Sequence, residues 1–504
     1  MSNLYRILES QFPRASDRCA FETPDGRYYT FDDLRAGSAK IANWLASLGI
    51  ARGSRIAVQV EKSVEAVMLY LAALRSGMVF LPLNTAYRES EIGYFIADAE
   101  PAVVVCSPTN YSWVEPIARA NGCSHVMTLG ESADGSLIQA ATPHRASFKT
   151  VSSRPDDLAA ILYTSGTTGR SKGAMLSHRN LASNARTLQK AWRWQRGDVL
   201  LHALPIFHVH GLFVALHGAL INGSKTLWCS KFDADQIIRL LPRATVMMGV
   251  PTFYVRLAAD DRLTRSVVKG IRLFISGSAP LLKETFEAFR AKTGHVILER
   301  YGMSETVMLT SNPYKGERRA GTVGFPLPGV GLRLRDDRGR AVRKRRQGVS
   351  EIGAVEVRGP NVFSGYWRMP EKTREEFTQD RWFRTGDMGQ WDADGYLHLI
   401  GRSKDLIITG GYNVYPKEIE MLIDEMAGVD ESAVIGIPHS DFGEAVTAVV
   451  VAKPGASLDP QAMIAEIKAR IANFKVPKAI HVVQTLPRNA MGKVQKNILR
   501  EQFS

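Results

Sequence analysis

Residues Ile161 to Gly173 read Ile-Leu-Tyr-Thr-Ser-Gly-Thr-Thr-Gly-Arg-Ser-Lys-Gly, and the rest of the chain is best interpreted outward from them. An apolar run leads into a segment where hydroxyl-bearing residues alternate with glycines, and Lys172 adds a positive charge. Glycines permit a positive φ and a close approach of the backbone, so successive N–H groups can converge on an anion. The stretch therefore predicts a loop that holds a polyphosphate. A flexible surface loop is the alternative, because clusters of Gly, Ser and Thr commonly form one.

The same stretch does not fit the Walker A pattern Gly-x-x-x-x-Gly-Lys-[Ser/Thr]. Counted from Gly166, Ser171 stands where the second glycine belongs, and Gly173 stands where a hydroxyl would hold magnesium. A magnesium ligand must therefore come from another part of the chain.

Length and composition describe an ordinary globular protein. The 504 residues exceed one typical core, which predicts two or three domains. The four cysteines, Cys19, Cys106, Cys123 and Cys229, lack the CxxC spacing of disulfide frameworks and zinc clusters. No apolar segment has membrane-spanning length, and the N-terminus lacks the order of a signal peptide. We therefore expect a cytoplasmic protein that does not bind a membrane.

The net charge of +14 raises the hypothesis of a nucleic-acid-binding protein. Part of the charge lies in one run from Arg338 to Arg346, which has no interleaved aromatic residues and is typical of a solvated loop. The remaining excess is spread along the chain and could attract polyphosphate or acidic small molecules equally well. We expect no nucleic-acid partner, and a non-enzymatic nucleic-acid-binding protein stays a remote alternative.

Hydrophobic periodicity predicts an α/β fold. Thr30 and Asp33 form a capping-box pattern for a helix to Leu48, and residues 55–60, 63–76 and 79–83 follow as strand, helix and strand. This order is typical of a parallel sheet covered by helices. Short strands with Gly/Asp turns over 324–398 indicate a β-rich subdomain. We expect an N-terminal domain over 1–401, with two α/β subdomains and this β-rich one, and a small α+β C-terminal domain over 402–504.

Several motifs together resemble the acyl-adenylate-forming superfamily, which includes acyl-CoA synthetases, luciferases and peptide-synthetase adenylation domains. They follow the family's order: Thr164–Gly173, Glu299–Glu305, Tyr366-Trp-Arg with Thr385-Gly-Asp387, Gly401–Asp405 and Pro487–Lys493. The resemblance covers essentially the whole chain. It implies a carboxylic acid that attacks the α-phosphate of ATP, and it implies ATP and CoA as co-substrates with Mg²⁺ as cofactor.

By this resemblance a set of residues binds the nucleotide: Thr164, Ser165, Gly166, Thr167, Thr168, Gly169, Lys172, Ser276, Gly277, Ser278, Ala279, Tyr301, Gly302, Ser304, Asp387 and Arg402. Tyr301 would stack on adenine, Asp387 would accept both ribose hydroxyls, and Arg402 would lie beside the ribose or a phosphate. The alternatives are a buried core tyrosine at 301 and an Asx-turn aspartate at 387.

The resemblance assigns the Mg²⁺ ligand to Glu305, with Thr164 contributing through the bound ATP. Outside this motif, a surface glutamate at the start of a helix would be the ordinary interpretation of Glu305.

The C-terminal motifs imply domain alternation. Lys493 would bridge the carboxylate and the α-phosphate during adenylation, and rotation at the hinge residue Lys404 would then replace it by Gly410 and Gly411, which line the CoA tunnel. A solvated terminal lysine is the alternative for Lys493. Its setting would also permit control by a lysine acetyltransferase. Ala490 departs from the family, whose members often carry Thr or Pro there.

The acid-binding residues implied by the resemblance are Arg256, Arg300, Met303 and His208. An arginine that faces a closed pocket needs an anionic partner, because a buried unpaired charge is costly. A second carboxylate on the substrate supplies it, and this pattern is similar to malonyl-CoA synthetases. The alternative is that the arginines pair with protein carboxylates such as Glu299. Met303 would limit the depth of the pocket, which still leaves room for methylmalonate.

Four histidines gather near the same region, His202, His208, His210 and His217. A metal site is conceivable, but no cysteine or carboxylate accompanies them locally. We prefer the family role for His208, which lines the acyl pocket and gates entry, and we treat it as a catalytic residue beside Glu305 and Lys493. His210 would be a neighbour of the pocket.

The residues and the resemblance together predict an ATP-dependent acid–thiol ligase that forms malonyl-CoA through an acyl-AMP intermediate with release of pyrophosphate. Methylmalonyl-CoA is its second candidate product. Its partners would be the small molecules malonate, ATP and CoA. A CoA ligase for aromatic or short-chain monocarboxylic acids is the alternative within the same fold. A module that adenylates a carrier protein is a further alternative, disfavoured because no carrier domain follows Lys493 in these 504 residues.

Overall fold

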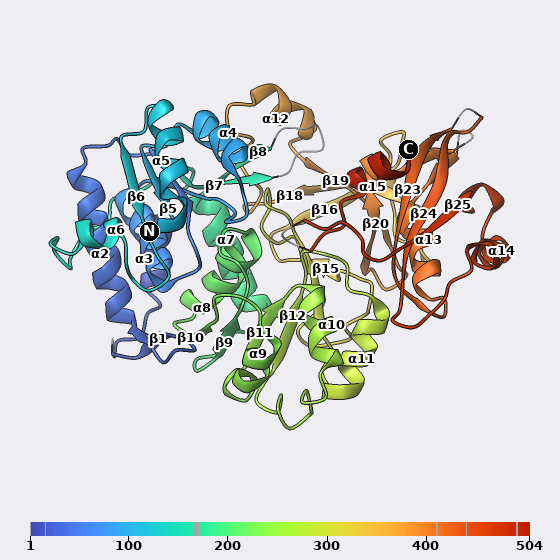
Figure 1. The fold of residues 1–504 in the computed structure, drawn as a ribbon, viewed down its shortest axis with the longest axis horizontal. Coiled ribbons are helices and arrows are strands. Elements are labelled where there is room, and N and C mark those ends of the chain that lie inside the picture. Colours follow the sequence, from blue (N-terminus) through green and yellow to red (C-terminus); the bar gives the residue numbers. More distant parts are fainter. Residues whose placement is uncertain (1, 16, 165–170, 410–411, 440, 490–491) are drawn as a thin grey trace. The chain divides into compact units, whose positions relative to one another are not determined.

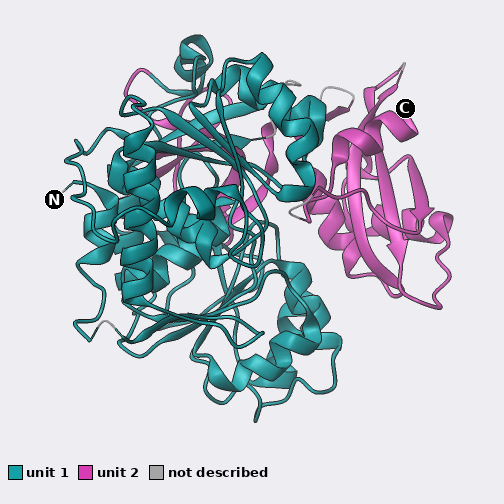
Figure 2. Ribbon diagram, turned by 60° about the vertical axis from the view of Figure 1, so that its left-hand side comes forward, with its two compact units in different colours: residues 1–331, 358–378 teal, residues 332–357, 379–504 magenta. Residues whose placement is uncertain are grey.

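The computed structural model describes residues 2–15, 17–164, 171–409, 412–439, 441–489 and 492–504. Two compact units make up the chain, one of Met1–Gly331 with Arg358–Thr378 and one of Leu332–Val357 with Gln379–Ser504 (Figure 2). The β-rich segment therefore belongs mostly to the same unit as the C-terminal part. The expected boundary of a moving domain at 401/402 stays a prediction.

The first unit contains a six-stranded sheet (Figure 1). Its order is β6 (His125–Thr128), β5 (Val103–Cys106), β3 (Arg55–Gln59), β4 (Val79–Pro82), β7 (Leu158–Thr164) and β8 (Lys172–Ser177). Neighbouring strands from β6 to β7 are parallel, and β8 returns antiparallel to β7. The predicted parallel sheet is confirmed, and its last two strands form a hairpin around the glycine-rich loop.

A nine-stranded sheet in the same unit has a parallel centre with antiparallel strands at both edges. Its order is β15 (Phe325–Pro326), β14 (Thr310–Ser311), β13 (Leu298–Tyr301), β12 (Leu273–Ser276), β11 (Val246–Gly249), β9 (Val199–His202), β10 (Lys225–Trp228), β1 (Cys19–Glu22) and β2 (Tyr28–Thr30). The carboxyl ends of parallel strands meet at one edge, where α/β proteins bind ligands. Residues that follow β9, β11, β12 and β13 therefore share that edge.

Helices connect these strands: α1 (Leu4–Glu9), α2 (Phe31–Ser47), α3 (Val64–Ser76), α4 (Glu89–Ala99), η1 (Pro108–Asn110), α5 (Tyr111–Ala120), α6 (Ser136–Ala141), α7 (His178–Ala191), η2 (His210–Leu216), α8 (His217–Leu220), α9 (Ala234–Leu240), η3 (Leu241–Arg243), α10 (Pro251–Ala259), α11 (Lys283–Thr293) and α12 (Pro370–Glu376). The capping box of Thr30 and Asp33 begins α2 as predicted. Ser177 and Asn180 form a second capping box, at the start of α7. Such caps satisfy amide donors that a helix N-terminus leaves unpaired.

The second unit holds two five-stranded sheets. The first has the order β17 (Ala341–Val342), β16 (Gly331–Arg335), β18 (Gly353–Arg358), β19 (Phe383–Trp391) and β20 (Leu397–Arg402). The second has β22 (Tyr412–Val414), β21 (Ile407–Thr409), β24 (Gly443–Ala452) and β23 (Val429–His439), and β25 (Ala479–Val483) also pairs with β24. The helices are η4 (Ser403–Asp405), α13 (Pro416–Asp424), α14 (Pro460–Arg470), η5 (Asn473–Lys475) and α15 (Lys496–Phe503).

The basic run from Arg338 to Arg346 lies around β17, and all of its arginines and Lys344 are exposed. This confirms the interpretation of a solvated segment. Among the described residues, no helix combines the length and the apolar character needed to cross a bilayer.

Candidate functional site

The glycine-rich loop is held at both ends by a strand hairpin. Thr164 ends β7 and Lys172 begins β8, and the two residues are paired across the hairpin. The Thr164 hydroxyl donates to the Lys172 carbonyl at 3.4 Å. The predicted loop residues Ser165, Gly166, Thr167, Thr168 and Gly169 lie outside the described residues. The hairpin thus brings the hydroxyl of Thr164 and the charge of Lys172 to the two ends of one loop.

The Lys172 side chain is buried, with 8% exposure. Its ammonium lies 3.6 Å from a carboxylate oxygen of Glu376 in α12, and 4.5 Å from the ring centroid of Tyr366. A cation above an aromatic face is attracted by the ring quadrupole, and more strongly when both groups are desolvated. Tyr366 and Glu376 therefore hold Lys172 in place from the segment 358–378.

Tyr366 also reaches the predicted magnesium ligand. Its hydroxyl donates to Glu305 Oε1 at 3.0 Å, and the backbone N–H of Phe363 donates to the Glu305 carbonyl at 2.8 Å. Glu305 is 5% exposed, so this hydrogen bond orients a nearly buried carboxylate. No group of three or more potential metal ligands occurs within the described ranges. A single carboxylate suits Mg²⁺ that arrives with ATP, because such sites use one or two carboxylates together with substrate phosphates.

Replacing Tyr366 by Phe tests the hydrogen bond from its hydroxyl to Glu305. The ring beneath Lys172 remains, but Glu305 loses a hydroxyl donor. A hydrogen bond to a charged group contributes about 1.5–3 kcal/mol, so we expect unfolding free energy to fall by about that amount. Because the freed carboxylate is less well oriented, we also expect KM for MgATP to rise while KM for the acid stays unchanged. Urea unfolding and initial-rate kinetics measure these quantities.

Tyr70→Phe is the matched control for that variant. Tyr70 is fully buried, and its hydroxyl is 2.9 Å from Nε2 of His217, a neutral partner. We expect a smaller loss of stability, about 1 kcal/mol, and no change in KM for MgATP. Equal changes in KM in both variants would contradict a specific role for Tyr366.

The turn that follows β12 contains the predicted adenine-binding residues. Ser276 ends the strand fully buried, and its hydroxyl has no hydrogen-bond partner among the described residues. Ser278 has a φ of 73°, in the left-handed region that costs non-glycine residues about 1–3 kcal/mol. Its hydroxyl lies 3.2 Å from Nδ1 of His210. Ala279 completes this turn. The turn is strained at Ser278, and Ser278 contacts His210 at the start of η2.

The residues after β13 form a second, compact turn. Tyr301 ends the strand and is buried, whereas Gly302, Met303 and Ser304 are partly buried. A Cβ on Gly302 would lie 1.9 Å from the Val307 carbonyl oxygen, so no larger residue fits there. The β13 turn therefore stands beside the β12 turn at the shared edge of the parallel strands.

Arg300 in β13 is buried, and it forms no ion pair with any residue that the structure describes. It is 4% exposed, and its Nε and Nη2 atoms have no hydrogen-bond partner among the described residues. Burial lowers the pKa of Arg300 to about 9, so the guanidinium remains charged at neutral pH. The alternative, a pair with Glu299, is not seen: Glu299 instead accepts from the Gly321 N–H at 3.1 Å. The contact of Arg300 with the acid stays a prediction.

Arg256 differs from that expectation. It lies on α10, where Tyr254 and Leu257 are the buried residues, and its own side chain is exposed. The argument that a buried charge needs a partner was therefore wrong for Arg256. Its contact with the acid stays a prediction based on the resemblance alone.

The four histidines separate into different environments. His208 is partly buried, and its Nδ1 accepts from the His210 N–H at 3.3 Å. His217 pairs with Tyr70, and His202 has Nε2 3.0 Å from the Gly211 carbonyl. They do not form a metal cluster within the described ranges.

Lys62 is a buried cation that sequence reasoning missed. Its ammonium is within 2.9 Å of both His202 Nδ1 and the His202 carbonyl, and it donates to the Cys229 carbonyl at 2.6 Å. It also lies 4.2 Å from the Trp228 ring centroid. Burial lowers the pKa of Lys62 to about 7. Lys62 contacts His202 at the end of β9, and His202 in turn contacts the Gly211 carbonyl near the start of η2. These contacts hold β9 and η2 together.

In the second unit, the predicted ribose-binding pair lies together. Asp387 in β19 and Arg402 in β20 face each other across the strands, with Arg402 Nε 2.7 Å from Asp387 Oδ1. Arg402 Nη1 also donates to the Thr385 carbonyl at 3.1 Å. Asp387 is only 7% exposed, so the arginine offsets the burial of its charge.

Two further predicted residues of this unit, Lys404 and Lys493, are exposed. Lys404 is exposed within η4. Lys493 is exposed in a turn where Asn489 Oδ1 accepts from the Lys493 N–H at 3.0 Å and Gly492 has a φ of 74°. Gly410, Gly411 and Ala490 lie outside the described residues.

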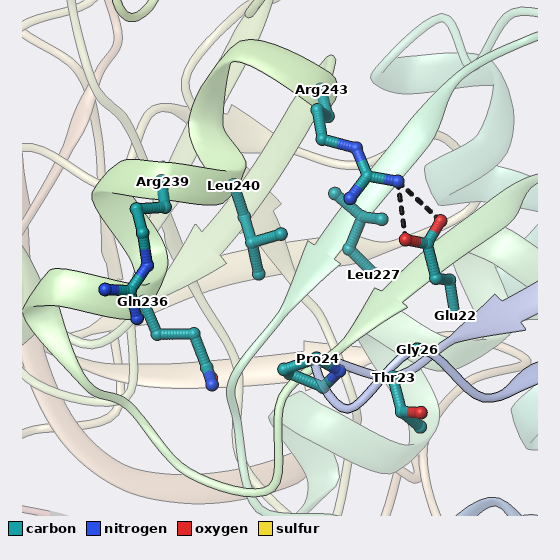
Figure 3. Close-up of a pocket in the computed structure, with 9 residues that line it drawn as sticks. All are labelled: Glu22, Thr23, Pro24, Gly26, Leu227, Gln236, Arg239, Leu240 and Arg243. Carbon is teal, nitrogen blue, oxygen red and sulfur yellow. Dashed lines mark hydrogen bonds and ion pairs between the residues drawn. The ribbon is translucent and has the colours of Figure 1, made fainter.

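A separate pocket of about 190 Å³ opens beside α9 and β1 (Figure 3). It is lined by Glu22, Thr23, Pro24, Gly26, Leu227, Gln236, Arg239, Leu240 and Arg243. The Glu22 carboxylate is already bound by Arg243 at 2.5 and 2.6 Å and by Lys225 at 2.5 Å. None of the described candidate site residues lines this pocket, whose lining contains one carboxylate, Glu22, and two guanidinium groups, Arg239 and Arg243.

Two family models match the chain. Residues 8–367 match "AMP-binding enzyme", and residues 418–493 match "AMP-binding enzyme C-terminal domain".

The chain is also similar to individual CoA ligases and to solved structures over nearly its whole length. A malonate–CoA ligase of Arabidopsis thaliana is 33% identical, over 99% of this chain and 89% of that protein. The crystal structure of ATP-bound MatB from Rhodopseudomonas palustris is 53% identical with a TM-score of 0.96, over 100% of this chain and 99% of that one. A benzoate CoA ligase from Burkholderia xenovorans LB400 is 27% identical with a TM-score of 0.89, over 99% of this chain and 100% of that one.

Proposed function

Because this chain belongs to the family of AMP-binding enzymes, we propose that it is an AMP-forming acid–thiol ligase whose acid is malonate. In the first step a malonate oxygen bonds to the α-phosphorus of ATP and pyrophosphate leaves. In the second step the CoA sulfur bonds to the acyl carbon, AMP leaves, and the thiol proton is released. The products are malonyl-CoA, AMP and pyrophosphate.

The main support for malonate as the acid is the buried guanidinium of Arg300, whose Nε and Nη2 atoms have no hydrogen-bond partner within the described ranges. A charge that is left unpaired in the protein interior destabilises the fold unless a ligand compensates for it. The distal carboxylate of malonate would accept from both Nε and Nη2, in the bidentate geometry that arginine favours. A monocarboxylic acid would leave these donors unsatisfied. The identity of 33% to a malonate–CoA ligase, against 27% to the benzoate CoA ligase, supports this preference.

The ATP half of the site would use the residues around the β7–β8 hairpin. Lys172 and the hydroxyl of Thr164 would offset charge on the leaving pyrophosphate. Glu305, oriented by Tyr366, would hold Mg²⁺ with the ATP phosphates. When bound, Mg²⁺ would offset the negative charge of the ATP phosphate oxygens. Lys172 would have to leave Glu376 when ATP binds, since one ammonium cannot serve both carboxylate and phosphate at full strength.

The remaining roles follow the resemblance. Asp387 would accept the ribose hydroxyls with Arg402 beside it, and Tyr301 would stack on the adenine. Lys493 would neutralise the reacting oxygens in the first step. Rotation at Lys404 would then bring Gly410 and Gly411 to the thiol of CoA. His208 would line the acid pocket, and Met303 would limit its depth.

Two further proposals concern the setting of the enzyme. All four cysteines are free thiols, which supports a reducing compartment such as the cytoplasm. Acetylation of the exposed Lys493 by a lysine acetyltransferase would remove its charge and stop adenylation; this control stays a prediction.

A panel of acids tests the proposed substrate. AMP release is followed with malonate, methylmalonate, succinate, acetate and benzoate, each with ATP, Mg²⁺ and CoA. A site built to bind a polar group rejects analogues without it by about 10⁴–10⁵-fold. We therefore expect the highest kcat/KM for malonate, a lower value for methylmalonate, and negligible rates with acetate and benzoate. Activity with benzoate but not with malonate would favour the monocarboxylate alternative.

A further inference from the structure

Glu376, the last residue of α12, places a carboxylate beside the lysine that follows the glycine-rich loop. Its Oε1 lies 3.6 Å from Nζ of Lys172, and the side chains of Lys172 and Glu376 are 10% and 24% exposed. Solvent and salt screen a partly buried ion pair less than a pair on the open surface. Lys172 therefore has an anionic partner that belongs to the protein itself.

Backbone contacts fix α12 against β8, so the pair is more than a chance meeting of two long side chains. The segment that precedes α12 runs beside β8 (Figure 1), where the Trp367 N–H donates to the Gly173 carbonyl at 2.8 Å. Thr373 in α12 is joined to this segment, because its hydroxyl accepts from the Tyr366 N–H at 2.9 Å. Residues three apart share one face of a helix, so Glu376 follows Thr373 on the face that is held.

A second lysine shares the Glu376 carboxylate. Nζ of Lys372 lies 3.3 Å from Glu376 Oε1 and 2.8 Å from Glu375 Oε2. Glu376 thus lies between two cations, Lys372 and Lys172. If Lys172 turns toward a phosphate, Glu376 keeps Lys372 as its partner, and no carboxylate loses its last cation. The arrangement therefore lets Lys172 change partners at little cost in free energy.

We propose that Glu376 is a positioning residue that competes with the phosphates of ATP for the Lys172 ammonium, so that it weakens the binding of MgATP and speeds the release of pyrophosphate. This inference rests on the proposed function, in which Lys172 offsets charge on the leaving pyrophosphate. An ammonium is a compact point charge, so a carboxylate and a phosphate cannot both contact it fully. Product release limits the turnover of many enzymes, and a carboxylate that takes the lysine back opposes retention of the product.

Glu376→Gln tests the competition, because it removes the charge and keeps the size of the side chain. We measure the Kd of MgATP in the absence of acid by calorimetry, and the Ki of pyrophosphate as a product inhibitor. Removing a competitor strengthens binding, so we expect both constants to fall by about 2- to 10-fold, with KM for malonate unchanged. A substitution that only damaged the fold would raise these constants instead.

Glu375→Gln is the matched control on the same helix. Glu375 contacts Lys372, and its side chain is 64% exposed. Because solvent and salt screen an exposed charge, we expect the Kd of MgATP to change by less than about 2-fold. Lys172→Met completes a double-mutant cycle: it should weaken the binding of MgATP, and adding Glu376→Gln to it should change nothing further.

The outcomes separate this inference from the proposed function. An unchanged or higher Kd in folded Glu376→Gln, or an equal fall in Glu375→Gln, would overturn the role of Glu376 and leave the ligase activity in place. If Glu376→Gln does not fold, Glu376→Ala is judged by the same outcomes, since alanine is favoured in helices. If Lys172→Met binds MgATP as tightly as the wild type, the proposed phosphate contact of Lys172 fails, and the role of Glu376 fails with it.

Discussion

Arg300→Met is expected to abolish most activity with malonate while leaving the protein as stable as the wild type, or more stable. Two hydrogen bonds to a carboxylate, each about 1.5–3 kcal/mol, correspond to about 10²- to 10⁴-fold in kcat/KM. The ligand-free fold, in contrast, loses an unpaired buried charge and gains an apolar side chain of similar length. Replacing buried ions by packed apolar groups is often neutral or stabilising. Steady-state kinetics and thermal unfolding measure the two effects on one preparation.

Arg272→Met provides the contrast. Arg272 Nε donates to Asp198 at 2.8 Å, and Asp198 is only 4% exposed. Removing this arginine leaves a buried carboxylate unpaired, which costs about 3–5 kcal/mol. We expect a clear loss of stability and, in the fraction that remains folded, an unchanged preference for malonate over butyrate. A similar loss of stability in both variants would show that Arg300 has a structural partner and would remove the main support for a dicarboxylate substrate.

The shift of the unfolding temperature on adding malonate is a third measurement on the same variants. A ligand that binds only the native state raises the unfolding temperature by mass action. We expect malonate to stabilise the wild type and Arg272→Met but not Arg300→Met.

Local patterns predicted the elements around the site well. The capping box of Thr30 and Asp33 and the apolar runs at β3 and β4 depend on neighbouring residues only, so the sequence contains the needed information. The parallel pairing of strands followed from helices that alternate with strands. The grouping of 332–357 with the C-terminal part could not be predicted, because it depends on strand pairings such as β18 with β19 that join distant segments.

Side-chain direction was the weakest part of the site prediction. Arg300 and Arg256 were interpreted alike, yet one is buried and the other exposed. The difference on α10 has a local signal: Tyr254 and Leu257 are three residues apart and mark the buried face, which leaves Arg256 outside it. For Arg300 no such signal exists, since its burial depends on Gly277 in a neighbouring strand's turn.

The contacts of Tyr366 and Lys62 were beyond sequence reasoning for a related reason. Tyr366 lies in the Tyr366-Trp-Arg motif, which indicates that it is near the site. Its hydrogen bond to Glu305, however, joins residues 61 positions apart in the sequence. Lys62 reaches His202 across 140 positions, and nothing in its neighbourhood in the sequence indicates burial.

Lys493→Ala is expected to stop the first half-reaction and spare the second. The Lys493 side chain is exposed, and the backbone bonds beside it do not involve that side chain: the Asn489 N–H donates to the Lys493 carbonyl at 2.9 Å, and the Gly492 N–H donates to the Asn489 carbonyl at 2.8 Å. Truncation of the side chain should therefore leave the turn and the fold intact. Loss of one charge-stabilising donor typically lowers kcat by about 10²- to 10³-fold. Pyrophosphate exchange measures adenylation, and thioester formation from supplied malonyl-AMP measures the second step.

Lys468→Ala is the control for this experiment, because Lys468 is an exposed lysine in the last turn of α14 in the same unit. It should leave both half-reactions and the thermal stability unchanged. An equal loss of both steps in Lys493→Ala would contradict a role confined to adenylation, since in that step alone the lysine would meet the α-phosphate. Unimpaired pyrophosphate exchange would assign Lys493 to the solvated surface instead. Selective loss of exchange, with normal thioester formation, would support one acid site that serves two reactions in turn.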